Sequence, residues 1–188
     1  MKIKVTQTSI DGLLIIEPHV FHDGRGYFFE SFNSSEFREA VGKRVSFVQD
    51  NQALSCCGVL RGLHFQLPPH SQAKLVSVVK GKVLDVAVDL RKGSPTYGKY
   101  EAVELSEDNH LQVFIPRGFA HGYLVLSETA LFQYKCDNLY AAASEGGLAW
   151  DDPDIGIDWP ADRQDILLSE KDRNRGLLKD FDSPFKYR

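Results

Sequence analysis

The sequence of 188 residues is poor in cysteine, has no long hydrophobic run and carries no excess of positive charge. Its three cysteines, two of them adjacent at Cys56 and Cys57, form no disulfide framework and lack the C-x-x-C spacing of a metal knuckle, so we interpret them as free thiols. The net charge of -4, with scattered Lys and Arg, excludes an extended basic face for nucleic acid. Any anionic ligand must therefore be bound by a local cluster of cations.

The apolar run near the N-terminus is broken by Glu17 and Pro18, so it is too short for a secretion signal or a membrane span. We therefore expect a cytoplasmic protein that contacts neither membrane nor nucleic acid. Ordinary hydrophobic and charged contents, 43% and 26%, and the lack of low-complexity segments predict one globular domain over residues 1–188.

From residue 75 onward the hydrophobic pattern has a period of two. In VLDVAVDL, Leu84, Val86, Val88 and Leu90 fall on one face, which we expect to lie in the core. Lys80-Gly81-Lys82 predicts a hairpin turn between this strand and LVSVV. Further strands are expected at residues 100–105, 110–115, 123–127 and 129–136.

Helix signals are scarce. SSEFREAVG, residues 34–42, offers a serine N-cap and a stop at Gly42, and SEKDRN, residues 169–174, offers one capped turn. Many short strands with Gly and Pro turns predict an all-β sandwich or jelly-roll barrel with a few short helices. The mouth of such a barrel can hold one small ligand.

The segment RGLHFQLPPHSQAK, residues 61–74, gathers titratable side chains where a strand gives way to a turn. A lone histidine among apolar residues is usually a packed side chain. However, Arg61 and Lys74 lie within a few residues of His64, and so many cationic groups together favour a site for an anion.

A second histidine, His121, follows the turn IPRGFA at the entry to a strand. The two histidine segments resemble the paired motifs of metal-binding cupin jelly rolls. Here His64-Phe65-Gln66 replaces the His-x-His of a metal cupin, and no glutamate follows at the usual position. Two imidazoles are fewer than the three protein ligands of a catalytic metal site, so we expect no metal.

Tyr134 and Asp172 each have an ordinary structural interpretation. Tyr134 shares a strand face with Ala130, Phe132 and Cys136, where tyrosine usually packs. Asp172 fits a capping box with Ser169 and could serve only the backbone of one helical turn.

Two further segments carry candidate ligand-binding groups. DGRGYFFESF, residues 23–32, forms a solvated hairpin or, alternatively, lets Arg25 reach a phosphate while its aromatic rings stack on a base. In FVQDN, Gln49 and Asn51 fall on one strand face and could bind hydroxyl groups.

In order along the chain, DGRGYFFESF, FVQDN, GVLRGLHFQ, AKLVSVVKGKVLDVAVDLRKGSPTYGK, IPRGFAHGY, QYKC, LAWDDPDIGIDWP and SEKD closely resemble the dTDP-4-dehydrorhamnose 3,5-epimerase family. The resemblance implies a cupin jelly-roll fold. It also implies cofactor-independent inversion at C3 and C5 of dTDP-4-dehydro-6-deoxy-D-glucose, giving dTDP-4-dehydro-L-rhamnose through an enolate.

The resemblance assigns His64 as the base, Asp172 as its partner, Tyr134 as the opposing acid and Lys74 as the cation near the enolate oxygen. It implies that the substrate is bound by Arg25, Glu30, Gln49, Asn51, Arg61, His121, Tyr140, Glu145 and Lys171, with Tyr140 stacking on thymine. It further implies a homodimer that exchanges N-terminal strands.

Two features depart from this scheme. The chain has Gln52 where the family usually has histidine, and strand parity places Arg61 and His64 on opposite faces unless the strand bends near Gly62. Four alternatives stay open: an epimerase of C3 or C5 alone, an epimerase of another nucleotide-linked keto-sugar, a 3,4-ketoisomerase, and a non-catalytic sugar-nucleotide binder.

Overall fold

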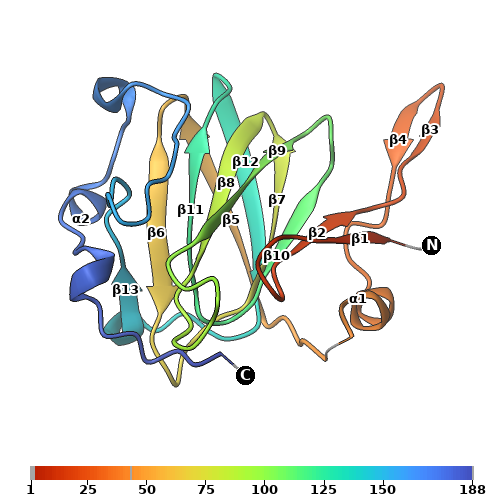
Figure 1. Cartoon of the computed structure of the whole chain (residues 1–188). Coiled ribbons are helices and arrows are strands. Elements are labelled where there is room, and N and C mark those ends of the chain that lie inside the picture. The colour runs from red at the N-terminus through yellow and green to blue at the C-terminus, as the bar shows by residue number, and fades with distance from the viewer. Residues whose placement is uncertain (1–2, 43, 188) are drawn as a thin grey trace.

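Two antiparallel sheets, packed face to face, form the body of the molecule (Figure 1). The structure is a computed structural model that describes residues 3–42 and 44–187. One sheet has six strands in the order β1 (Lys4–Gln7), β2 (Leu14–Glu17), β10 (Gln112–Ile115), β7 (Lys74–Lys80), β12 (Thr129–Cys136) and β5 (Gln49–Cys56). The other has five, in the order β13 (Glu145–Gly147), β6 (Leu60–Gln66), β11 (Phe119–Val125), β8 (Lys82–Asp89) and β9 (Tyr100–Ser106). The expected all-β jelly-roll architecture is confirmed.

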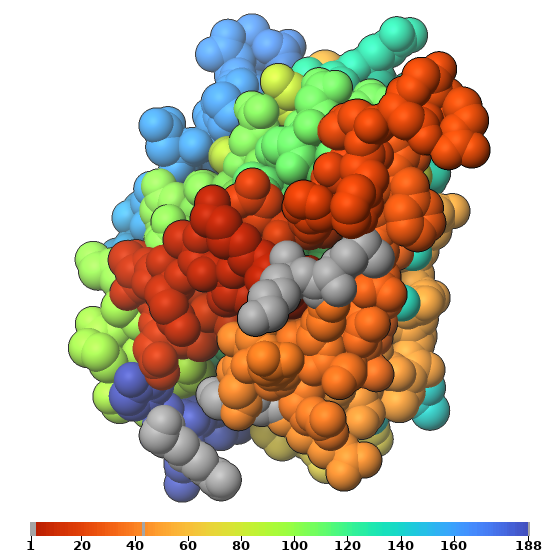
Figure 2. Space-filling view, turned by 90° about the vertical axis from the view of Figure 1, so that its right-hand side faces the viewer, coloured from red at the N-terminus to blue at the C-terminus, as the bar shows by residue number. Residues whose placement is uncertain are grey.

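Short helices and one hairpin complete the chain. The helices are α1 (Ser34–Val41), α2 (Glu170–Arg173) and the 3₁₀ turns η1 (Ala142–Ser144), η2 (Arg163–Asp165) and η3 (Leu178–Asp180). Strands β3 (Phe21–Asp23) and β4 (Gly26–Phe28) form a hairpin that projects away from the body (Figures 1 and 2). Within the described residues, no helix is both long and apolar enough to cross a membrane.

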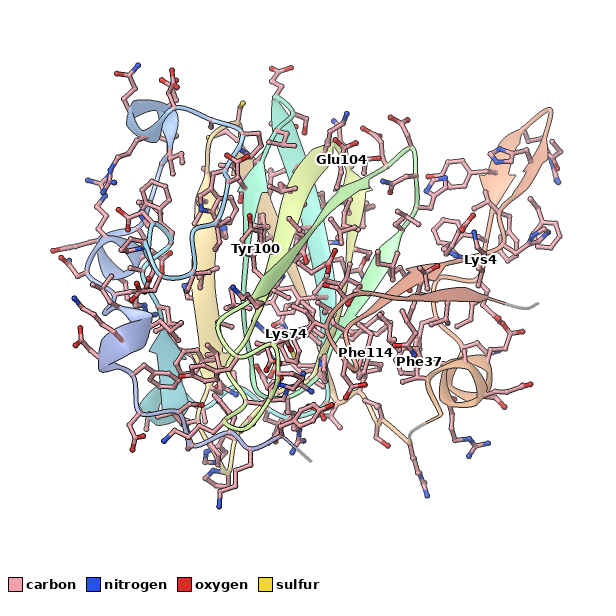
Figure 3. All side chains as sticks on the ribbon, in the orientation of Figure 1. Lys4, Phe37, Lys74, Tyr100, Glu104 and Phe114 are labelled. Carbon is pink, nitrogen blue, oxygen red and sulfur yellow. The ribbon has the colours of Figure 1, made fainter. Side chains whose placement is uncertain are left out.

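Apolar side chains fill the space between the sheets and also cover their outer faces. Phe132 and Val76 belong to the core between the sheets. On the outer face of the six-stranded sheet, Phe37 of α1 packs edge-on against Phe114 of β10, with ring centroids 5.3 Å apart (Figure 3). The C-terminal segment covers the outer face of the five-stranded sheet.

Strand β8 corrects one prediction, because both of its faces are buried. Val86 and Val88 pack outward under the C-terminal segment, whereas Val83 and Ala87 face the core between the sheets. The face expected in the core is thus covered by a later part of the chain. Asp85 lies on the inner face and is only 2% exposed.

Lys80-Gly81-Lys82 is not a hairpin turn, contrary to the prediction. Strand β7 pairs with β10 and β12, while β8 pairs with β9 and β11, so the chain crosses from one sheet to the other at Gly81. The Gly81 N–H donates to Glu107 Oε1 at 2.8 Å. A glycine between two strands therefore marks a corner of the barrel rather than a strand pair.

The cap of helix α1 also differs from the prediction, which assigned it to a serine. The side-chain oxygen of Asn33 accepts hydrogen bonds from the backbone N–H groups of Ser35 and Glu36, at 3.0 and 3.2 Å. Gly42 ends the helix in a left-handed conformation, as expected.

Candidate active site

A cavity of about 450 Å³ opens between the two sheets. Its walls come from β6, β7, β11 and β12 and from residues 167–172 of the C-terminal segment. A second cavity of about 350 Å³ adjoins it and shares His64, Lys74, Tyr134 and Glu145. Two adjoining chambers of this size can hold a ligand with two parts.

His64 and Asp172 form a hydrogen-bonded pair at the side of the cavity. His64 Nε2 lies 2.5 Å from Asp172 Oδ1, and the Asp172 side chain is almost fully buried. Burial alone would raise the pKa of Asp172, but its hydrogen bonds with His64 and Ser169 lower it below its usual value. An ionised carboxylate in this position fixes the imidazole tautomer and stabilises an imidazolium.

Asp172 also lies in the helix cap that the sequence predicts with Ser169. The Ser169 hydroxyl accepts from the backbone N–H of Asp172, at 3.1 Å, as an N-cap does. The Asp172 carboxylate also contacts His64, so the short helix α2 presents it to the cavity.

A second imidazole and carboxylate pair lies deeper between the sheets. His121 Nε2 is 2.7 Å from Asp85 Oδ2, and both side chains are at most 6% exposed. Burial lowers the pKa of His121, and the nearby Asp85 charge opposes that shift. His121 lies inside β11 rather than at the strand entry that we expected.

Lys74, labelled in Figure 3, is half-buried at the start of β7, on the opposite sheet from both histidines. Burial lowers its pKa, while Cys136 and Asp85 act in the opposite direction. Its Nζ lies 5.8 Å from the centre of the Tyr134 ring. Burial raises the pKa of Tyr134, so the phenol remains a proton donor at neutral pH.

The second chamber is lined by amide and aromatic groups. Gln49 Nε2 donates to Asn51 Oδ1 at 2.9 Å, and Gln49 Oε1 accepts from the backbone N–H of Tyr140 at 2.8 Å. The Tyr140 hydroxyl donates to Glu145 Oε2, and Lys171 contacts Glu145 Oε1 at 2.6 Å. Burial opposes ionisation of Glu145, but hydrogen bonds from Lys171, Tyr140 and Arg175 lower its pKa to about 2.

Comparison with known proteins identifies the family of the chain. A sequence model of the dTDP-4-dehydrorhamnose 3,5-epimerase family matches residues 7–180. A relative of that name from Methanothermobacter thermautotrophicus is 53% identical over 180 residues, covering 95% of this chain and 96% of the relative. The chain belongs to this epimerase family.

Solved structures show the same likeness. An epimerase from Legionella pneumophila, crystallised with dTDP-4-keto-L-rhamnose, has a TM-score of 0.95 and 47% identity, covering 99% of each chain. The dTDP-4-dehydrorhamnose 3,5-epimerase from Elizabethkingia anophelis has a TM-score of 0.92 and 53% identity, covering 96% of this chain and 98% of that chain. The cupin jelly roll is therefore the fold of this epimerase.

The epimerase cavities gather most of the side chains proposed from sequence. The first cavity holds His64, Lys74, Tyr134, Asp172, Arg61, His121, Glu145 and Lys171, and the second adds Gln49, Asn51 and Tyr140. Arg25 and Glu30 line neither cavity within this chain. Arg25 is 91% exposed at the tip of the β3–β4 hairpin and pairs with Asp23, and Glu30 accepts from Asn33.

A backbone irregularity brings Arg61 and His64 to the same cavity, as the expected bend requires. His64 lies opposite His121, but Arg61 lies opposite Tyr123, so β6 has one more residue than β11 over this interval. Gly62 has a φ of 151°, and a Cβ on it would lie 2.6 Å from the Gly122 Cα. The bulge and the close approach of the two strands both depend on glycine.

Sequence reasoning missed two charged residues of the site, Arg175 and Asp85. Arg175 donates to Glu145 at 2.6 Å and has no recognisable local motif. Asp85 carried a usable signal, because a carboxylate inside an otherwise apolar strand must find a partner.

Proposed function

We propose that this protein is a cofactor-independent 3,5-epimerase that converts dTDP-4-dehydro-6-deoxy-D-glucose into dTDP-4-dehydro-L-rhamnose. The observation that supports the proposal is that His64 and Tyr134, the proposed base and acid, line one cavity from different sheets. His64 comes from the five-stranded sheet and Tyr134 from the six-stranded sheet. Inversion at a carbon needs a base on one face of it and an acid on the other.

The chemistry follows from the ketone at C4, which makes the hydrogens on C3 and C5 acidic. Because His64 donates Nε2–H to Asp172, its Nδ1 is the nitrogen that takes a proton, and Asp172 stabilises the resulting imidazolium. The ammonium of Lys74 stabilises the enolate oxygen. Tyr134 then donates a proton to the opposite face of the carbanion.

The nucleotide half of the substrate would occupy the second chamber. Tyr140 offers a ring for stacking, Gln49 and Asn51 offer hydrogen bonds, and Arg61 and Lys171 offer positive charge near the first chamber. Substitution of Gln52 for a polar ring would alter only the outer face of β5, because Gln52 points away from the cavity side of that strand.

The proposed reaction needs no metal, and among residues 3–42 and 44–187 no three His, Cys, Asp or Glu side chains gather as metal ligands do. Activity should therefore survive treatment with EDTA. Loss of activity that returned with zinc, iron or manganese would contradict the metal-free proposal.

The proposed assembly is a homodimer that exchanges N-terminal strands. Its support is the β3–β4 hairpin, which projects from the body and exposes the rings of Tyr27 and Phe28 to 55% and 65%. In a dimer these rings would be covered, and Arg25 and Glu30 would help complete the partner's cavity. Light scattering that gave a fully active single chain would contradict this assembly. A cytoplasmic location stays a prediction from the sequence.

Proton NMR of dTDP-4-dehydro-6-deoxy-D-glucose with the protein in deuterium oxide tests the reaction. We expect deuterium to replace hydrogen at both C3 and C5 as the product forms. Exchange at one carbon only, even after long incubation, would show an epimerase of a single centre. No exchange would contradict the proposed reaction and would leave a sugar-nucleotide binder or an epimerase of another nucleotide-linked keto-sugar.

A further inference from the structure

Arg175 lies between two carboxylates of the site, Asp172 and Glu145. One of its terminal nitrogens donates to Glu145 Oε1 at 2.6 Å, and its Nε lies 3.9 Å from Asp172 Oδ1. The side chain is 13% exposed. Its Nε is one of only two buried side-chain polar atoms without a hydrogen-bond partner in the part of the chain that the structure describes. A small shift of the guanidinium would bring this free N–H to Asp172.

The backbone around Arg175 forms a fitted slot for this side chain. A Cβ at Gly147 of β13 would lie 2.7 Å from Arg175 Nε and 2.6 Å from the Leu63 carbonyl oxygen. Only glycine lets β13 pass this close to the guanidinium. The following residue, Gly176, forms a parallel bridge with Leu148, and its carbonyl accepts from the Ala149 N–H at 2.8 Å. The backbone next to Arg175 is therefore held against residues 148 and 149.

The two carboxylates serve different halves of the cavity. Asp172 binds the proposed base, His64, in the first chamber, and Glu145 binds Tyr140, which lines the second chamber. Arg175 thus lies between a carboxylate of the reacting end and one that contacts the nucleotide end. Lys171 contacts the same Glu145 oxygen at 2.6 Å, but it is 60% exposed.

We infer that Arg175 is a positioning residue that couples nucleotide binding at Glu145 and Tyr140 to the orientation of the Asp172–His64 pair. A nucleotide that orders Tyr140 and Glu145 would hold the guanidinium in place, and the guanidinium would then hold Asp172 against His64. The inference rests on the proposed epimerase function, because that function makes His64 a base.

The test compares rates of deuterium exchange into dTDP-4-dehydro-6-deoxy-D-glucose at saturating substrate. Arg175→Gln should lower kcat about tenfold or more, because a base misplaced by a fraction of an ångström loses much of its rate. Arg175→Lys keeps the charge but not the planar fork, so we expect an intermediate kcat. Arg173→Gln is the matched control: it removes the same charge from an exposed neighbouring position and should leave kcat unchanged.

A double-mutant cycle shows whether Arg175 acts through Asp172. In an Asp172→Asn background, Arg175→Gln and Arg175→Lys should each lower kcat by less than twofold. Equal fold-losses in both backgrounds, or a kcat of Arg175→Gln within twofold of wild type, would overturn the inference. If Arg175→Gln does not fold, the fold-losses of kcat that Arg175→Lys causes in the wild-type and Asp172→Asn backgrounds decide the question. Failure of the wild-type protein to exchange either hydrogen would contradict the proposed function, whereas normal exchange by Arg175→Gln contradicts only the role of Arg175.

Discussion

His64 and His121 face each other as cross-strand partners on β6 and β11, and each binds its own carboxylate through Nε2. The two pairs differ in access. The His64 side chain is 33% exposed and that of His121 is 6% exposed. The accessible pair suits proton exchange with a substrate, and the buried pair suits a fixed contact at the base of the cavity.

Replacing His64 with alanine should remove the base for both carbons. We expect exchange and turnover to fall by roughly 10²–10⁴-fold, the usual loss of general acid–base catalysis. Asp172→Asn should cause a smaller loss, because it disturbs the imidazole without deleting it. His70→Ala, in the same segment but bonded to Ser144, is the control and should behave as wild type. Unchanged exchange in His64→Ala would show that another group is the base.

Tyr134→Phe should separate exchange from inversion. The variant keeps His64, Lys74 and nearly all of the packing, but it loses the proton donor on the opposite wall. Hydrogen at C3 or C5 should still exchange through His64, while NMR and chiral analysis of the product should show little net inversion. If Tyr134→Phe inverts both carbons at the wild-type rate, the acid is misassigned.

Asp85→Asn should change the pH dependence of the rate. Burial lowers the pKa of Lys74, and the charge of Asp85 is one of the groups that oppose this shift. The proposed reaction needs the charged lysine, so the rate should fall as pH rises through that pKa. Removing the Asp85 charge should lower the pKa of Lys74 further. The alkaline limb of the profile of kcat against pH should then move to lower pH. Asp50→Asn, at an exposed carboxylate paired with Lys135, should leave the limb in place. An unmoved limb in Asp85→Asn would contradict the coupling.

Glu145→Gln should lower stability in a pH-dependent way. The pKa of Glu145 is lowered from 4.5 to about 2 in the folded protein. A lowered pKa contributes stability above the unfolded-state value, and that stability is lost as pH falls toward the folded-state value. The difference in urea midpoint between wild type and Glu145→Gln should therefore be largest above about pH 4.5 and shrink toward pH 2. Glu104→Gln should show no comparable trend, because Glu104, labelled in Figure 3, is exposed and pairs with the exposed Lys82.

The positions of most strands could be predicted, because alternation depends on local sequence. It placed Ala130, Phe132 and Cys136 on one face of β12, and all three are buried there. Local sequence alone favoured ordinary packing for Tyr134. Only the resemblance to the epimerase family, which depends on many segments in order, assigned His64 and Tyr134 to one site, and both line the same cavity.

The pairing of strands could not be predicted in the same way, because it depends on distant partners. Lys80-Gly81-Lys82 has the composition of a hairpin turn, yet β7 and β8 find their partners in different sheets. Arg175 escaped notice for the same reason, since its contact with Glu145 joins residues 30 positions apart. The roles of Arg25 and Glu30 stay predictions, since they depend on a second chain.

The close approach of Gly62 to Gly122 has a consequence for mutational scanning. Neither residue has a functional group, yet a methyl group at position 62 would meet the backbone of the neighbouring strand. In a screen for activity, both glycines should tolerate as few substitutions as His64 does. Yield of folded protein should separate the two classes: variants at His64 accumulate without activity, whereas variants at Gly62 fail to accumulate. Intolerance at these glycines reports the spacing of two strands, and it should not be mistaken for a sign of chemistry.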